Sequence, residues 1–321
     1  MLGVFLDRDS VDRGDLDFSA LDNLIDNWQF YGLTRPEDLH ARIQDAHIII
    51  SNKVVLDEAA FNAAPQLKLV CVAATGYNNV DLAAAQKHGV IVSNVRAYAT
   101  PSVSQHVFAL ILSLSIHLGK YRRAVMKHEW QQSSHFCLLN YPIEELAGKT
   151  LGIIGYGELG HAVAHIGKAF GMNVLVSDHR GCEPREVRVS FEQVLKQADV
   201  ISLHCPLTAD TKGLIGAEEL RQMKSSALLI NTASGGIVDE QALADALRDG
   251  RLAGAGVDVL SKEPPDDSSP LLGDDIPNLV VTPHIAWASR ASRQRLLDEI
   301  GKNISTFLAG SPRNIVTEWA L

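Results

Sequence analysis

Three glycines, Gly155, Gly157 and Gly160, have the spacing G-x-G-x-x-G directly after an apolar run at residues 151–154. Apolar residues at positions 159, 163, 166 and 170 then predict a helix. In such a strand–turn–helix unit the first glycine allows a tight turn, the second lets the backbone approach a pyrophosphate, and the third packs helix on strand. The start of the helix adds amide donors and partial positive charge. We therefore expect a dinucleotide on this loop.

An acidic residue, Asp178, ends the next apolar run of the chain, MNVLVSD. A carboxylate at this strand end accepts hydrogen bonds from the adenosine ribose and repels a 2′-phosphate. The position of Asp178 therefore predicts NAD rather than NADP, and Arg180 nearby weakens that preference.

Candidate acid–base residues lie further along the chain, in the segments VDVLSKEPP and VVTPHIAW, which contain Asp258, Glu263 and His284. Both segments follow or contain apolar runs, and the carboxyl ends of parallel strands line the ligand crevice of an open α/β sheet. A histidine backed by a carboxylate keeps its proton near neutral pH and can deliver it to a carbonyl oxygen. His284 is therefore predicted to protonate a carbonyl that receives hydride.

Two sets of buried strands must position these residues. In the first 95 residues, apolar runs at 3–6, 47–51, 69–73 and 90–93 are separated in the later part by helical stretches at 57–64 and 81–89. Six further runs alternate with helices from residue 149 onward, and the segment 289–310 has the pattern of an amphipathic helix. A helix over 101–119 is expected between the two sets, with Thr100 as its cap and Gly119 marking its end. This alternation predicts two doubly wound parallel sheets.

Composition and spacing exclude several classes of function. The 321 residues are 46% hydrophobic with a net charge of −9, which argues against a nucleic-acid-binding surface. The longest apolar run, at 107–118, is shorter than a membrane span, and the four cysteines form no CxxC pair, so we expect a cytoplasmic protein. The 12 histidines show no metal-ligand spacing. Ser234 lacks the G-x-S-x-G context of a hydrolase nucleophile.

Five motifs, in order, make a family resemblance specific: GYGELG, LHCPLT, LINTASGG, GVDVLSKEPP and TPHIAWAS. Over essentially the whole chain the sequence resembles the D-isomer-specific 2-hydroxyacid dehydrogenases. The segments ATGYNNVD and YATPSVSQHVFAL further resemble the glycerate dehydrogenase (hydroxypyruvate reductase) branch.

The resemblance implies an α/β fold with a flavodoxin-like substrate domain, residues 1–100 plus 288–321, and a Rossmann NAD-binding domain, residues 101–287. It also implies an oxidoreductase that transfers hydride between NAD(H) and a small D-2-hydroxy acid or 2-oxo acid. Reduction of hydroxypyruvate or glyoxylate to D-glycerate or glycolate is the expected reaction, in a homodimer without nucleic-acid or membrane partners.

Carried over residue by residue, the resemblance makes His284 the proton donor, Glu263 its partner, and Gly76, Tyr77 and Asn78 the backbone that holds the substrate carboxylate. The implied cofactor contacts are Thr75, Gly155, Gly157, Glu158, Leu159, Gly160, Asp178, Cys205, Thr232, Ala233, Asp258, His284 and Trp287.

Ser234 departs from the family, whose loop reads N-T-A-R-G-G where this chain has NTASGG. The family arginine binds the substrate carboxylate with paired charged donors, whereas a serine offers one neutral donor. We therefore expect reduced turnover unless another arginine substitutes, with Arg96 and Arg290 as candidates. The sequence leaves open whether Ser234 is natural or an engineered replacement. It also leaves open a second function, an NAD(H)-binding sensor or scaffold with little turnover.

Overall fold

The computed structural model describes residues 1–182 and 185–317. The chain forms two compact units: unit 1 is Met1–Ala99 together with the segment from Trp287 onward, and unit 2 is Thr100–Ala286. The boundaries expected from the sequence each lie one residue further along the chain.

Unit 1 is a parallel five-stranded sheet in the order β2-β1-β3-β4-β5, with helices on both faces. In chain order its elements are β1 (Leu2–Phe5), the 3-10 helix η1 (Arg8–Ser10), α1 (Ser19–Asp22), β2 (Asn27–Phe30), α2 (Pro36–Ile43), β3 (Ile48–Ser51), α3 (Glu58–Ala63), β4 (Leu69–Val72), α4 (Leu82–Lys87), β5 (Ile91–Ser93) and α11 (Arg290–Leu308).

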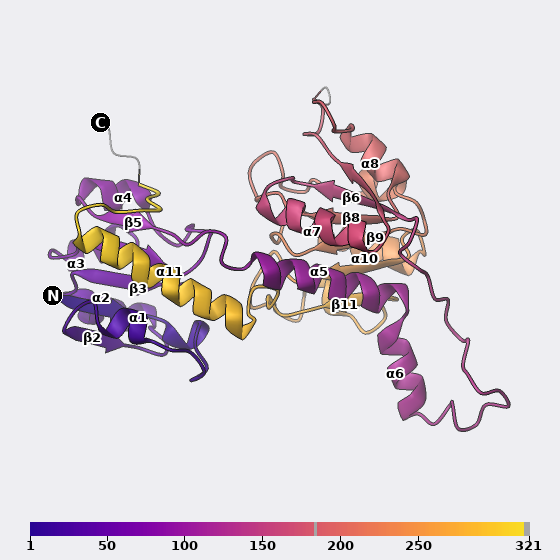
Figure 1. Ribbon diagram of the computed structural model, residues 1–321, viewed down its shortest axis with the longest axis horizontal. Helices are drawn as coiled ribbons and strands as arrows, with labels where there is room; N and C mark the ends of the chain where they lie inside the picture. Colours follow the sequence, from indigo (N-terminus) through magenta and orange to yellow (C-terminus); the bar gives the residue numbers. More distant parts are fainter. Residues whose placement is uncertain (183–184, 318–321) are drawn as a thin grey trace. The chain divides into compact units, whose positions relative to one another are not determined.

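The central strands of unit 1 are apolar at nearly every position because both faces of the sheet are covered; Ser51, which ends β3, is a buried polar exception. In β3, Ile48 and Ile50 pack in the cluster that contains residues of α11, whereas Ile49 packs in the cluster with residues of α2 and α3. Figure 1 shows α11, in yellow, crossing one face of this sheet. The edge strand β2 was not predicted; its residues alternate between exposed and half-buried, and only two of the four are aromatic.

Unit 2 is a parallel six-stranded sheet in the order β11-β10-β9-β8-β6-β7. Its elements are α5 (Thr100–Ser115), α6 (Leu118–Met126), β6 (Thr150–Ile154), α7 (Glu158–Ala169), β7 (Asn173–Val176), α8 (Phe191–Gln197), β8 (Val200–Leu203), α9 (Ala217–Gln222), β9 (Leu228–Asn231), α10 (Glu240–Arg248), β10 (Gly254–Val257), the 3-10 helix η2 (Pro270–Leu272) and β11 (Leu279–Val281).

The edge of this sheet beyond β7 carries a remnant of another strand. Val189 forms a single parallel bridge with Ser177. Counting that bridge, the first half of unit 2 follows the 3-2-1 order of a dinucleotide-binding sheet, with β8 continuing on the other side of β6. The predicted α/β class with two parallel sheets is confirmed.

The predicted single helix over 101–119 was wrong. α5 ends at Ser115, His117 adopts a left-handed φ of 49°, and α6 begins at Leu118, so that Gly119 lies inside the second helix. Among the described residues no single helix has the length and apolarity to cross a bilayer; α5 and α6 reach that length only as a pair bent by 59°. More than half of the residues of α5 are buried inside unit 2.

Candidate active site

The three glycines of the loop between β6 and α7 meet three different constraints. Gly155 has a φ of 93°, and a Cβ there would lie 2.5 Å from the backbone nitrogen of Cys205. A Cβ on Gly160 would lie 2.2 Å from the carbonyl oxygen of Gly155. Around Gly157, in contrast, a Cβ would meet nothing within 4 Å. The first and third glycines are therefore required by the fold, and the second stands before open space at the start of a 12-residue helix.

Two buried polar atoms lie at the same carboxyl edge of the sheet. Thr232 Oγ1, after β9, and His204 Nδ1, after β8, have no hydrogen-bond partner among the described residues. Buried polar groups without a partner are rare in folded proteins and call for an explanation such as a polar ligand. Open space at a helix N-terminus and unpartnered polar atoms on the neighbouring strand ends fit a dinucleotide.

Asp178 follows β7 as predicted, but its carboxylate is occupied by an arginine. The Arg185 guanidinium donates to both oxygens, through Nε at 2.9 Å to Oδ2 and Nη2 at 2.6 Å to Oδ1. Arg188 lies 3.7 Å away. The bonds from Arg185 hold the pKa of Asp178 well below its usual range. Arg180, which the sequence placed near this carboxylate, instead pairs with Glu219.

The two side chains predicted to act as an acid–base pair are in contact. His284 Nδ1 lies 2.5 Å from Glu263 Oε2, while Glu263 Oε1 accepts a bond of 2.9 Å from the amide of Leu260. Both side chains remain partly exposed, at 41% and 34%. A carboxylate on Nδ1 fixes the tautomer with a proton there, so a proton delivered elsewhere by the imidazolium leaves from Nε2.

Asp258 is a structural anchor for the loop that carries His284. Its carboxylate is almost completely buried and accepts bonds of 2.9 Å from the amides of Ile285 and Ala286. The Thr282 hydroxyl donates to the same carboxylate at 2.5 Å. Thr282 was not among the predicted site residues, because neither the spacing nor the type of a threonine before proline marks it as a ligand.

The loop containing Ser234 is held by its own backbone and by Asn231. The Asn231 side chain accepts from the amide of Ala233 at 3.1 Å and donates to the carbonyl of Ser234 at 3.0 Å. A Cβ on Gly235 would lie 2.0 Å from the carbonyl oxygen of Leu260, so this loop packs directly on the segment that leads to Glu263. Ser234 is half-buried, and its hydroxyl has no hydrogen bond within the described residues.

In unit 1 the predicted substrate loop follows β4. Thr75 Oγ1 donates to the carbonyl of Val95 at 2.9 Å, and Asn94 donates to the carbonyl of Thr75 at 2.7 Å. Gly76, Tyr77 and Asn78 are exposed beyond this junction. Trp287 also belongs to unit 1, where its ring makes an edge contact with Tyr98. The remaining predicted site residues belong to unit 2.

The two candidate arginines differ in their surroundings. Arg290 donates to the carbonyl of Asp15 at 2.9 Å. Arg96 follows Val95 at the carboxyl end of β5, is exposed, and makes no hydrogen bond or ion pair within the described part of the chain. Of the two, Arg96 is the one whose guanidinium is not engaged by any residue that the structure describes.

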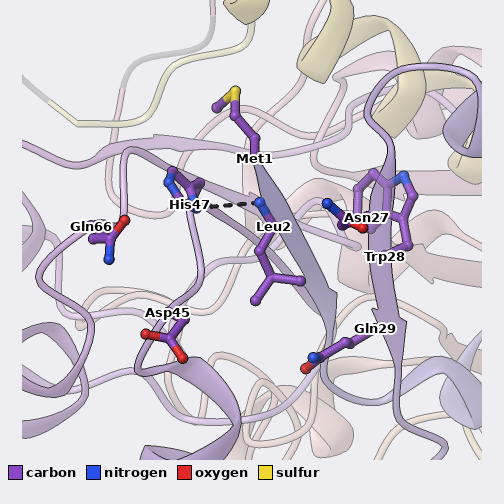
Figure 2. A pocket seen from close by; sticks show the side chains of 8 residues that line it. All are labelled: Met1, Leu2, Asn27, Trp28, Gln29, Asp45, His47 and Gln66. Carbon is purple, nitrogen blue, oxygen red and sulfur yellow. Dashed lines mark hydrogen bonds between the residues drawn. The ribbon is translucent and has the colours of Figure 1, made fainter.

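A cavity of about 480 Å³ in unit 1 lies away from these residues. Figure 2 shows the side chains that line it, with His47 Nδ1 accepting a bond from the amide of Leu2. The lining residues come from the amino-terminal ends of the strands: Met1, Leu2, Asn27, Trp28, Gln29, Asp45, His47 and Gln66. Ligands of open α/β sheets bind at the opposite, carboxyl ends, so we do not assign the reaction to this cavity.

Comparison with known proteins agrees with this geometry. A model of the D-isomer specific 2-hydroxyacid dehydrogenase, NAD binding domain matches residues 108–286. The chain is 46% identical to a glycerate dehydrogenase of Methylorubrum extorquens over 98% of both chains. It is 40% identical to a hydroxypyruvate reductase of Blautia hydrogenotrophica, over 98% of this chain and 99% of that one.

A solved structure shares the fold at full length. The D-lactate dehydrogenase of Aquifex aeolicus, complexed with NAD and lactic acid, superimposes with a TM-score of 0.82 and 31% identity over 100% of both chains. The expected NAD cofactor and oxidoreductase class are thereby confirmed. The chain belongs to the D-isomer-specific 2-hydroxyacid dehydrogenase family, and it is an NAD-dependent enzyme of that family.

Proposed function

We propose that this enzyme reduces hydroxypyruvate or glyoxylate, forming D-glycerate or glycolate. The bond between His284 Nδ1 and Glu263, on a strand-end loop of the sheet that carries the glycine loop, is the observation that supports proton delivery to a carbonyl. The names of the two relatives, glycerate dehydrogenase and hydroxypyruvate reductase, support these substrates.

NADH, when bound, supplies the hydride. His284 delivers a proton from Nε2 to the carbonyl oxygen, so that the ketone or aldehyde becomes a hydroxyl group. Glu263 stabilises the imidazolium before this transfer and keeps the ring in one orientation. The proposed contacts of the cofactor are the glycine loop with Glu158 and Leu159, the ribose partner Asp178, and Thr75, Cys205, Thr232, Ala233, Asp258 and Trp287.

The substrate carboxylate is proposed to bind the backbone of Gly76, Tyr77 and Asn78. Ser234 would contribute one neutral donor where relatives of this family place an arginine. Losing a charge-assisted pair in a desolvated site costs about 2–5 kcal/mol, or about 30- to several-thousand-fold in kcat/KM at tenfold per 1.36 kcal/mol. Arg96, whose guanidinium is not engaged, is the candidate substitute.

The test is steady-state NADH oxidation with hydroxypyruvate and glyoxylate, on this protein and on Ser234→Arg side by side. A gain of about 30-fold or more in kcat/KM for the variant is expected from the restored charge pair. A fast unmodified enzyme that the arginine does not improve would contradict the role given to Ser234. His284→Gln is the control for chemistry, with an expected loss in kcat of about 10²- to 10⁴-fold.

A sensor or scaffold without turnover receives no support from the relatives described above, which are enzymes. Its signature would be NADH binding by fluorescence with no oxidation in the presence of any 2-oxo acid. That result would overturn the proposed reaction.

We also propose a homodimer in the cytoplasm. α6 and the segment that follows it project from the rest of unit 2 (Figure 1) and expose large apolar side chains: Met126, Trp130, Phe136, Leu139 and Ile143. Large apolar side chains exposed along one projecting segment support a protein–protein interface there. The four cysteines are unpaired, as in reducing compartments. Sedimentation of Phe136→Ser against the unmodified protein tests the dimer: a monomer is expected for the variant.

A further inference from the structure

Helix α5 contacts both ends of the loop that carries His284. Ser102 Oγ donates to the carbonyl of Ala286 at 2.7 Å. His106 Nε2 lies 3.0 Å from Thr282 Oγ1. Ser102 and His106 are four residues apart, so they lie one above the other on the same face of the helix. Side chains of the helix therefore contact residues 282 and 286, on either side of His284.

The direction of the hydrogen bonds in this cluster follows from counting protons. A threonine hydroxyl has one proton, and that of Thr282 is donated to Asp258 Oδ1 at 2.5 Å. The oxygen of Thr282 must then accept from His106, which fixes a proton on His106 Nε2. The same nitrogen lies 3.6 Å from Asp258 Oδ1. His106, Thr282 and Asp258 thus form a chain of directed bonds.

Asp258, the last of these three hydrogen-bonded residues, holds the backbone around His284. Asp258 accepts from the amides of Ile285 and Ala286, and its own carbonyl accepts from the amide of His284 at 2.8 Å. His284 has a φ of 54°, in the left-handed region that residues other than glycine rarely adopt. A residue persists in this conformation only when its surroundings hold it there.

Helix α5 packs closely on β10, the strand that precedes Asp258. A Cβ on Gly256 of β10 would lie 2.9 Å from Leu110 Cβ of α5, so helix and strand are in close contact at this point. Two residues after Gly256 comes Asp258. The neighbours of His106 on the helix, Val103 and Val107, are buried and apolar, whereas the His106 side chain is 18% exposed.

We propose that His106 is a positioning residue for the reaction: through Thr282 and Asp258 it holds His284 in the backbone conformation from which the proton is delivered. Ser102 performs the same task at the other end of the loop. The inference rests on the proposed function only in taking His284 as the proton donor. The role requires a donor at position 106 and no charge transfer through it.

The decisive variants are His106→Leu, which removes the donor, and His106→Gln, which keeps one. Misplacing a reacting group by about 1 Å can cost about a hundredfold in rate, so we expect His106→Leu to lower kcat about 10- to 100-fold. The glycine loop and Asp178 are untouched, and Asp258 is the one proposed cofactor contact within the His106–Thr282–Asp258 cluster, so KM for NADH should change much less than kcat. His106→Gln should recover most of the loss. Ser104→Ala is the matched control, since Ser104 bonds only to carbonyls of its own helix.

A second pair of variants changes Thr282, the other partner of the hydrogen bond with His106. Thr282→Val should reproduce the loss in kcat, Thr282→Ser should restore it, and the double variant His106→Leu/Thr282→Val should be no worse than the poorer single variant. If His106→Leu fails to fold, the two Thr282 variants still test whether the bond between His106 and Thr282 positions His284. Equal losses for His106→Leu and His106→Gln, or additive losses in the double variant, would overturn the proposal.

Hydrogen exchange separates this inference from the proposed function. Faster exchange of the Ile285 and Ala286 amides in His106→Leu, with unchanged exchange in β6 and β8, is expected whether or not a 2-oxo acid is turned over. An inactive parent enzyme would overturn the proposed reaction but not the positioning. Unchanged exchange at these two amides would overturn the positioning even in an active enzyme.

Discussion

Units 1 and 2 share a strand order, but they differ at the carboxyl end of the first strand of each sheet. A carboxylate closes this place in unit 1, whereas glycines leave it open in unit 2. Their sheets run β2-β1-β3-β4-β5 and β7-β6-β8-β9-β10-β11, so that in each the winding reverses beside the first strand, where open α/β sheets bind ligands. In unit 1 this place is closed by Asp7, whose carboxylate accepts from the amides of Asn52 at 2.9 Å and Lys53 at 2.7 Å. In unit 2 it is formed by Gly155 and Gly157.

The difference shows how one scaffold provides both a structural junction and a binding site. Asp7 satisfies the amides at the end of β3 from within the protein and is buried there; that burial raises the pKa of its carboxyl group. The glycines of unit 2 leave open space before Gly157, at the start of α7. Side chains at the strand ends, and not the order of the strands, decide which unit binds the dinucleotide.

The largest effect is expected when unit 2 receives a carboxylate like that of Asp7 in unit 1. Gly157→Asp places a negative charge where the phosphates are expected, and like charges brought together cost several kcal/mol. We expect the Kd for NADH, measured by fluorescence titration, to rise about a thousandfold, which corresponds to about 4 kcal/mol.

Gly157→Ala is the graded control for that variant. Because nothing lies within 4 Å of the added Cβ, the fold should be retained and the Kd should rise far less than in Gly157→Asp. Equal weakening by alanine and aspartate would show that space, and not charge, governs the site.

Asp178→Asn should change the choice of cofactor. The neutral amide of asparagine does not repel a 2′-phosphate as the carboxylate does, and Arg185 and Arg188 are released to bind one. We expect the ratio of kcat/KM for NADPH over NADH to rise about 10- to 100-fold, or about 1.4–2.8 kcal/mol. Asp199→Asn, directly before the amino end of β8 and paired with Lys224, is the control. A ratio that moves equally in both variants would contradict the role of Asp178.

The smallest effect on cofactor binding is expected for Asp7→Asn, which instead weakens the junction of unit 1 by about 1–3 kcal/mol at pH 4. Because the folded protein holds the proton of Asp7 more tightly than the unfolded chain, the stabilisation is complete below the usual pKa of 3.8 and is lost as pH rises through the raised value. The penalty should therefore shrink between pH 4 and pH 7. Hydrogen exchange in β1 and β3 measures it, and a penalty that grows with pH would refute the direction. The Kd for NADH should not change.

Much of this architecture is local and was predicted. The local sequence pattern predicts the strands with apolar runs, the glycine loop and the C-terminal amphipathic helix. Each of these features depends on the types and spacing of neighbouring residues. Strand β2 was missed because an edge strand has one partner strand and lacks a continuous apolar run. The break between α5 and α6 was missed because no glycine or proline marks it: His117 takes a left-handed φ there, and Asn278 contacts its ring.

The cofactor loop, the pair of His284 with Glu263, and the departure at Ser234 could all be recognised in the amino-acid order, because each depends on residue types at fixed positions. The engagement of Asp178 by Arg185, and the chain from His106 through Thr282 to Asp258, arose only on folding. His106 and Thr282 are separated by 176 residues, and nothing in the local pattern around either one encodes the partner. Their bond exists because α5 packs on β10 at Gly256, a contact that only the assembled sheet and helix create.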